Sequence, residues 1–214
     1  VSCWGGNGFS QLGDGTTTNR NSPVAVLYID EQIVSISEQD RNNDGVLDFF
    51  GNEYLGGQHG STIVSTKISS GSHHTCAIFE DDDVYCWGLN AFGQSGTAAS
   101  TTPNEIPYRV NDIQDAKSIS LGSGTSCALT DEDKVYCWGW NSLGQLGIGS
   151  YDNTHTPTLV DLGTNYQANT VDTSGSHTCS ILNSGEIWCW GDNTNGELGD
   201  CLLYTSPSPR DKRQ

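Results

Sequence analysis

In this 214-residue sequence, the residues best suited to covalent or metal-binding chemistry are cysteines spaced ten residues apart. The candidate reactions are disulfide formation and zinc binding, and zinc sites favour gaps of about two to four residues. Between the two cysteines of each pair the sequence reads as a strand, a polar turn and a second strand. This hairpin would place the two thiols opposite each other, within the range of a disulfide. We therefore predict three disulfides, Cys76–Cys86, Cys127–Cys137 and Cys179–Cys189.

A second stretch has the pattern of a calcium-binding loop. Oxygen-bearing side chains alternate along residues 40–48, and Gly45 follows the third ligand position, as in D-x-[DN]-x-[DN]-G. Gly51 stands at the twelfth position, where a bidentate glutamate belongs, so Glu53 or water would complete the shell. The alternative is an acidic hairpin turn, which Asn-Asp-Gly also favours. The candidate Ca²⁺ ligands are Asp40, Asn42, Asp44, Val46 and Asp48.

The cysteines lie within an internal repeat. The pattern Cys-Trp-Gly-x-Asn-x-x-(Gly/Ser)-(Gln/Glu)-x-Gly starts at Cys3, Cys86, Cys137 and Cys189, and the last three starts are 51 and 52 residues apart. A fixed period of this length indicates stacked or radially arranged units. Each unit offers about four short strands, and long helical patterns are absent from the sequence. Four antiparallel strands per unit predict an all-β fold made of β-propeller blades.

Residues that recur at one position of the repeat are expected to be structural. The tryptophans should form the core between blades, and the asparagines should shape glycine-flanked turns. His74 and His177 each precede a cysteine by two positions, but Thr125 stands there in the unit between them, which favours a hydrogen-bonding role over catalysis. The recurring residues are Trp4, Trp87, Trp138 and Trp190, and Asn7, Asn90, Asn141 and Asn193.

The repeat divides the chain into blades that are incomplete at both ends. Cys3 has no partner, because the residue ten positions earlier would precede Val1. The last fourteen residues resemble a sequencing adaptor translated in frame, and we treat them as a non-native tail. The expected divisions are a partial blade at 1–36, an insertion with the calcium pattern at 37–66, blades at 67–112 and 113–163, a truncated blade at 164–200 and the tail at 201–214.

These motifs resemble the regulator of chromosome condensation (RCC1) repeat family. The shared pattern is Gly-x-x-His-(Thr/Ser)-Cys-Ala-Leu, an acidic turn, then Val-Tyr-Cys-Trp-Gly-x-Asn-x-x-Gly-Gln-Leu-Gly, and it covers nearly all of residues 1–29 and 67–200. The resemblance implies a seven-bladed propeller, of which this chain would be a fragment completed by further blades of a longer protein. The paired cysteines resemble those of a bacterial secreted or surface branch of the family.

Composition narrows the functional classes. The formal net charge of −17 disfavours a nucleic-acid partner, because phosphates are attracted to basic surfaces. The sequence has no apolar run of about twenty residues, so no membrane-spanning helix is expected. Disulfides are typical of oxidising compartments, which predicts an extracellular or cell-surface location.

No catalytic constellation stands out from the repeat. The glycine-rich loops lack the lysine of a phosphate-binding loop, and no nucleophile elbow is present. We therefore expect a non-enzymatic module that binds a protein or a glycan through loops that differ between blades, among them those with Trp140, Trp188, Tyr151 and His155. The alternatives are a polysaccharide-active enzyme and, as the family founder implies, a nucleotide-exchange factor for a small GTPase.

Overall fold

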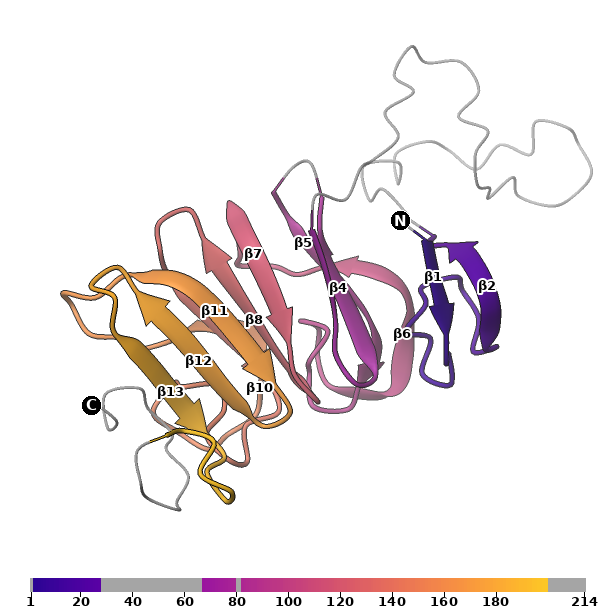
Figure 1. Ribbon diagram of the computed structural model, residues 1–214. Helices are drawn as coiled ribbons and strands as arrows, with labels where there is room; N and C mark the ends of the chain where they lie inside the picture. The colour runs from indigo at the N-terminus through magenta and orange to yellow at the C-terminus, as the bar shows by residue number, and fades with distance from the viewer. Residues whose placement is uncertain (1, 28–66, 80–81, 200–214) are drawn as a thin grey trace, which may run out of the picture.

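The computed structural model describes residues 2–27, 67–79 and 82–199, and regular secondary structure in these ranges consists of β-strands. The strands form separate antiparallel sheets that stand side by side (Figure 1). Their bounds are β1 Ser2–Gly5, β2 Arg20–Ala25, β3 Lys67–Ser70, β4 His74–Ile78, β5 Val84–Asn90, β6 Ser100–Arg109, β7 Ala116–Leu121, β8 Thr125–Thr130, β9 Val135–Gly139, β10 Thr154–Leu159, β11 Ala168–Ser174, β12 His177–Leu182 and β13 Ile187–Gly191.

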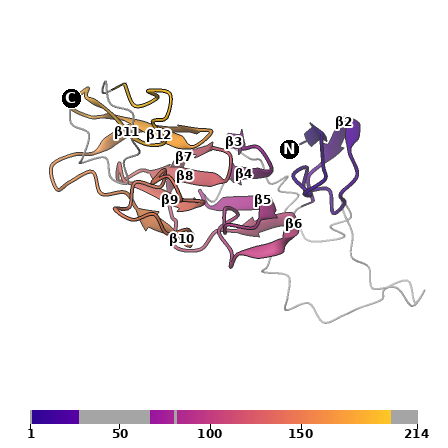
Figure 2. The same ribbon diagram turned by 90° about the horizontal axis from the view of Figure 1, so that it is seen from below.

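Each sheet is a meander in which consecutive strands are neighbours. The strand orders are β3-β4-β5-β6, β7-β8-β9-β10, β11-β12-β13 and, at the N-terminal end, β1-β2. Seen from below, the first strands β3, β7 and β11 lie along one side of the array, and the last strands β6 and β10 lie along the other (Figure 2). The all-β, four-stranded architecture predicted from the repeat is therefore confirmed.

In the two four-stranded sheets, the second strand is buried on both faces, whereas the last strand is largely exposed. Every residue of β4 and of β8 is buried, because a neighbouring sheet covers each face. In contrast, β6 and β10 stand at sheet edges and carry Pro103, Pro107 and Pro157. Proline lacks the N–H that an interior strand must donate, so these sequences are suited to edges.

A disulfide joins the two central strands of each complete hairpin. The paired cysteines are direct cross-strand neighbours with Cα atoms 4.1 Å apart, in the pairs Cys76–Cys86, Cys127–Cys137 and Cys179–Cys189. Closing so short a loop is worth about 2–3 kcal/mol in the chain-entropy picture. The hairpin geometry thus accounts for the ten-residue spacing.

The hydrophobic core lies between sheets. One cluster joins the β3–β6 sheet to the β7–β10 sheet, and its members include Ile78 and Val84 from the first sheet and Trp138 from the second. A second cluster joins the β7–β10 sheet to β11–β13 around Trp190. Because each sheet depends on its neighbour for burial, the array is held together by its junctions.

Several predictions fall on residues that the structure does not describe. The calcium pattern and the rest of the 37–66 insertion lie outside the described ranges, as does the tail at 201–214. Among the described residues, no helix is long and apolar enough to span a membrane.

Candidate interaction surfaces

A recurring hydrogen-bond pattern locks each sheet to the one before it. The indole N–H of the repeat tryptophan and the hydroxyl of the Thr or Ser opposite it both donate to one backbone carbonyl of the preceding unit. The tryptophans of all three junctions are fully buried. Donor–acceptor distances are 2.9 Å for Trp87 and 2.9 Å for Thr75 to Gln11 O, 3.0 Å for Trp138 and 2.7 Å for Ser126 to Gln94 O, and 3.0 Å for Trp190 and 2.9 Å for Thr178 to Gln145 O.

Trp4 differs from the other tryptophans of the repeat. It is 63% exposed, whereas its three equivalents are fully buried, so the expectation of a core position is wrong for this residue. The reason is that burial of the repeat tryptophan depends on the Gln carbonyl and side chains of the preceding sheet. Within the described residues, β1 belongs to the first sheet and has no such predecessor.

The repeat asparagines close the long loops that follow the central hairpins. Each is fully buried, and its Oδ1 accepts the backbone N–H of the residue five positions later, at 2.9–3.1 Å. Where further bonds are recorded, Nδ2 donates to carbonyls beyond, as Asn141 does to Ser150 and Asp152 at 2.9 Å. The asparagine side chains therefore fix the backbone conformation of the loops through hydrogen bonds.

The repeat glutamine holds the tip of the same loop. Its Oε1 accepts the N–H of the residue two positions earlier, which is Phe9, Phe92 or Leu143. Each distance is 2.9 Å. The loop tip is therefore pinned while its side chain points outward.

The pinned loops form one end of the array, which we call the loop face (residues 5–18, 88–99, 139–153 and 191–199, with the turns 71–73, 122–124 and 175–176). It lies at the lower end of the strands in Figure 1. Two aromatic pairs cross between units here. Phe92 stacks on Trp140 with centroids 5.8 Å apart and an interplanar angle of 28°. Phe9 meets His73 edge-on at 4.9 Å.

The opposite end, which we call the turn face (residues 82–83, 111–115, 131–134, 161–167 and 183–186), is acidic. Its carboxylates partly pair with cations, as in Arg109–Asp83 at 2.5 Å and Lys134–Glu132 at 2.5 Å. Lys117 likewise pairs with Asp133 and lowers the pKa of that carboxyl. No group of three or more His, Cys, Asp or Glu in the described ranges is arranged to hold a metal ion.

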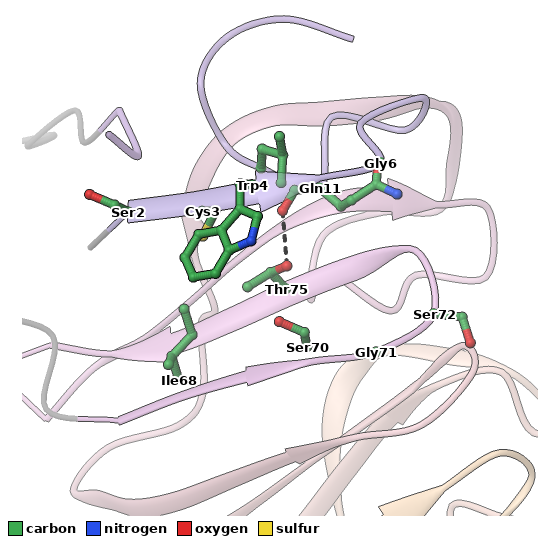
Figure 3. A pocket seen from close by; sticks show the side chains of 11 residues that line it. Ser2, Cys3, Trp4, Gly6, Gln11, Ile68, Ser70, Gly71, Ser72 and Thr75 are labelled. Atoms are coloured by element: carbon green, nitrogen blue, oxygen red, sulfur yellow. Dashed lines mark hydrogen bonds between the residues drawn. The ribbon is translucent and has the colours of Figure 1, made fainter. Parts of the chain in front are cut away.

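A cavity of about 480 Å³ opens between the first sheet and β3–β4 (Figure 3). Trp4 and Ile68 lie on its two sides, and the Thr75–Gln11 bond lies at its base. At the other junctions, the first strand of a sheet packs on the first strands of its predecessor, as β7 does against β3 and β4. In the described part of the chain the first sheet has only β1 and β2. The cavity thus marks the place that inner strands occupy in the other units. Cys3, also at this cavity, forms a disulfide with none of the other described cysteines, and partial burial raises the pKa of its thiol.

Among the residues that the structure describes, His74 and Ser126 form the one buried pair that resembles a base and a nucleophile. The Nε2 atom of His74 lies 2.9 Å from the Ser126 hydroxyl, but both residues are fully buried and the hydroxyl donates to Gln94 O. Burial, with a smaller contribution from His73, lowers the pKa of His74 to about 3. The pair is therefore a junction contact. Sequence reasoning missed Ser126, although a Thr or Ser precedes the first cysteine of every pair.

The residues proposed for recognition because they vary between units are dispersed. Trp140 and Tyr151 belong to the loop face, whereas His155 lies on β10 and packs against Gly93 of the preceding unit. Trp188 instead is 2% exposed and packs on Tyr166 inside the core, so a recognition role for it is wrong.

Four-stranded meanders that lock face to face through a repeated tryptophan define a β-propeller repeat protein. Two family models, both described as the regulator of chromosome condensation (RCC1) repeat, match the chain. One matches residues 66–94, 116–145 and 170–197, and the other matches 81–129 and 132–181. The chain belongs to the RCC1 repeat family.

Known relatives are much longer than this chain. It is 29% identical over 153 residues to the human E3 ubiquitin-protein ligase HERC2, covering 71% of this chain and 3% of that protein. It is 30% identical over 203 residues to the mitochondrial RCC1 domain-containing protein RUG3 of Arabidopsis thaliana, covering 92% of this chain and 42% of the relative. Among solved structures, yeast RCC1 (Prp20) bound to Kap60 superposes with a TM-score of 0.71 at 18% identity, over 98% of this chain and 43% of that one.

Proposed function

We propose that this chain is part of a non-catalytic propeller whose loop face binds another protein. The observation that carries the proposal is the loop face itself, where aromatic side chains are exposed on loops that buried Asn and Gln side chains hold in place. Preorganised, exposed aromatics are what protein interfaces use as anchors, because little entropy is lost on binding. The structural relative from yeast was solved in complex with a protein, Kap60.

The test compares the two ends of the array. Trp140→Ala alters the loop face, and Ile187→Ala, at a residue 63% exposed near the turn face, is the control. We expect binding to an array of purified peptides of varied charge to fall at least tenfold in Trp140→Ala and to persist in Ile187→Ala. Equal losses in both variants, or no peptide binding at all, would contradict the proposal.

Two alternatives have distinct outcomes. Exposed aromatics also stack on sugar rings, so binding to a glycan array with the same dependence on Trp140 would favour a glycan receptor. Hydrolysis of a polysaccharide by the purified protein would favour an enzyme. A nucleotide-exchange role would appear as faster nucleotide release from a small GTPase.

We further propose that the parent protein is secreted or displayed at a cell surface. The three disulfides support this, because such bonds persist in oxidising compartments. Non-reducing digestion and mass spectrometry of the native protein should find all three bridges, and free thiols at these six cysteines would argue for a reducing compartment.

A further inference from the structure

We infer that the partner of the loop face presents a lysine or arginine side chain, which packs on the Phe92–Trp140 pair. This inference rests on the proposed function and names the chemistry of its partner. It follows from where the aromatic rings, the acidic residues and the cations of the described residues lie.

The aromatic pair is held from below, and its upper side is open to the extent that Phe92 is exposed and Trp140 is half-buried. The backbone N–H of Trp140 donates to Gly124 O at 2.8 Å, and the Thr125 hydroxyl donates to Trp140 O at 3.0 Å. Gly124 lies directly beneath the pair, because a Cβ there would meet Trp140 Cβ at 3.3 Å and Phe92 Cδ2 at 3.5 Å. Phe92 is nevertheless 38% exposed. Two rings from neighbouring units therefore form a small, rigid aromatic platform.

Acidic residues accompany the platform on the same face. Asp152 is exposed on the loop that the Asn141 side chain holds in place, and it belongs to the same repeat unit as Trp140. Asp192 occupies in the next unit the position that Trp140 occupies in its own, and Glu197 occupies the position of the repeat glutamine. Hydrogen bonds from Asn195 lower the pKa of Glu197, which keeps that carboxylate ionised.

Cations, in contrast, are confined to the other end. Of the five lysines and arginines in the described ranges, Lys67, Arg109, Lys117 and Lys134 lie at or next to the turn face. Arg20 is the exception, and it pairs with Asp14 at 2.7 Å, a carboxylate that also accepts bonds from Asn7 and Thr16. Among the described residues of the loop face, an anionic partner would therefore meet no lysine or arginine other than Arg20, which is already paired with Asp14.

A partly exposed aromatic platform among carboxylates attracts cations through two separate interactions. The ring quadrupole binds a cation over its face, most strongly with tryptophan, and the carboxylates add long-range attraction. The same charge distribution disfavours a second copy of this chain as the partner, since two loop faces would bring like charges together. A basic segment of another protein is the complementary occupant.

The test uses the purified chain and fluorescein-labelled hexapeptides containing three arginines, measured by fluorescence anisotropy. A matched peptide replaces arginine by citrulline, which keeps the shape and removes the charge. We expect the arginine peptide to bind about tenfold more tightly than the citrulline peptide, a difference of about 1.4 kcal/mol, because only arginine makes cation–π and charge contacts.

Variants separate the platform from general charge attraction. Trp140→Leu should weaken binding about fivefold while Trp140→Phe retains most of it, because Phe keeps a π face and Leu keeps only apolar area. Asp192→Asn should weaken binding and reduce its salt dependence. Glu132→Gln on the turn face is the matched charge control and should leave binding unchanged.

Three results would overturn the inference. Equal binding of the arginine and citrulline peptides would remove the charge argument. Unchanged binding in Trp140→Leu would leave only non-specific attraction to an acidic protein. Trp140-dependent binding to neutral peptides or to a glycan, with no preference for arginine, would keep the loop face as the interaction surface and reject a basic partner.

Discussion

At the scale of single residues, burial decides whether a repeated side chain behaves as its position predicts. Trp4, Trp87, Trp138 and Trp190 share one sequence position, yet Trp4 alone is exposed because no sheet in the described ranges covers it. His74 shows the converse. Its sequence position suggested only a hydrogen bond, and the structure adds a desolvated ring wedged at a junction. The exposure of Trp4 and the burial of His74 could not be predicted from residue type, since both depend on whether a neighbouring unit covers the side chain.

His74 should make the stability of the protein sensitive to acid. Its pKa falls from an ordinary value of 6.5 to about 3 in the folded state, so the folded protein holds the neutral ring. Stability from this group is complete above about pH 6.5 and is lost as pH falls toward 3, at about 1.4 kcal/mol per pH unit. Denaturant unfolding should show this slope between about pH 6.5 and 4.5, and no contribution from His74 between about pH 7.5 and 6.5.

The variant His74→Thr isolates that effect, because Thr125 occupies the equivalent position in the next unit. We expect a smaller loss of stability between pH 7.5 and 4.5 in this variant than in the native chain. His177→Thr, at the half-buried equivalent position, is the control and should retain the native slope. If all three proteins share one slope, other groups govern the acid response.

At the scale of elements, the hairpins were predictable, whereas for the junctions only the tryptophan core was, and the atoms that accept its hydrogen bonds were not. The ten-residue cysteine spacing encodes its own hairpin, since turn length and strand register are local. The junction acceptors are backbone carbonyls of Gln11, Gln94 and Gln145, and a backbone atom leaves no trace in residue type. The sequence signals for this contact were its two donors, the repeat tryptophan and the recurring Thr or Ser before each first cysteine.

The two donors of a junction should prove energetically coupled. At the last junction, Trp190 and Thr178 both donate to Gln145 O, and all three residues are fully buried. Either Trp190→Phe or Thr178→Val leaves the carbonyl one partner, costing about 1 kcal/mol for the hydrogen bond, with an added cavity cost for the smaller ring. The double variant leaves a buried carbonyl unpaired.

Unfolding of the two single variants and the double variant in denaturant measures this coupling. We expect the double variant to lose at least about 1 kcal/mol more than the sum of the singles, and the cavity cost cancels in the cycle. Trp4→Phe, at an exposed position, should change stability by less than about 0.5 kcal/mol. Additive losses would mean that water replaces the missing donors.

At the scale of the whole molecule, the repeat places acidic side chains mainly at one end of the array and exposed aromatic side chains mainly at the other. Strand direction places the turn between the two disulfide-linked strands of each unit at one end and the asparagine loops of the described units at the other, so acidic turns accumulate together and aromatic loops do likewise (Figure 1). The sequence predicted the all-β propeller architecture, because a 50-residue period is visible without a structure. It did not predict this polarity, which arises only when units stand side by side.

The excess of negative charge must be taken into account when the calcium prediction is tested, because a cation can stabilise an acidic chain without a specific site. This prediction concerns residues outside the described ranges. With 26 acidic and 9 basic residues, any divalent cation should stabilise the chain slightly by reducing self-repulsion. A specific site would act differently, since a ligand that binds only the folded state raises stability with its own saturation curve. The melting temperature should therefore rise more with Ca²⁺ than with Mg²⁺ at equal ionic strength. Asp44→Ala should abolish this difference, and Glu132→Ala, which removes a charge elsewhere, should preserve it. Identical responses to the two ions in the native chain would leave residues 40–48 as an acidic turn without a metal.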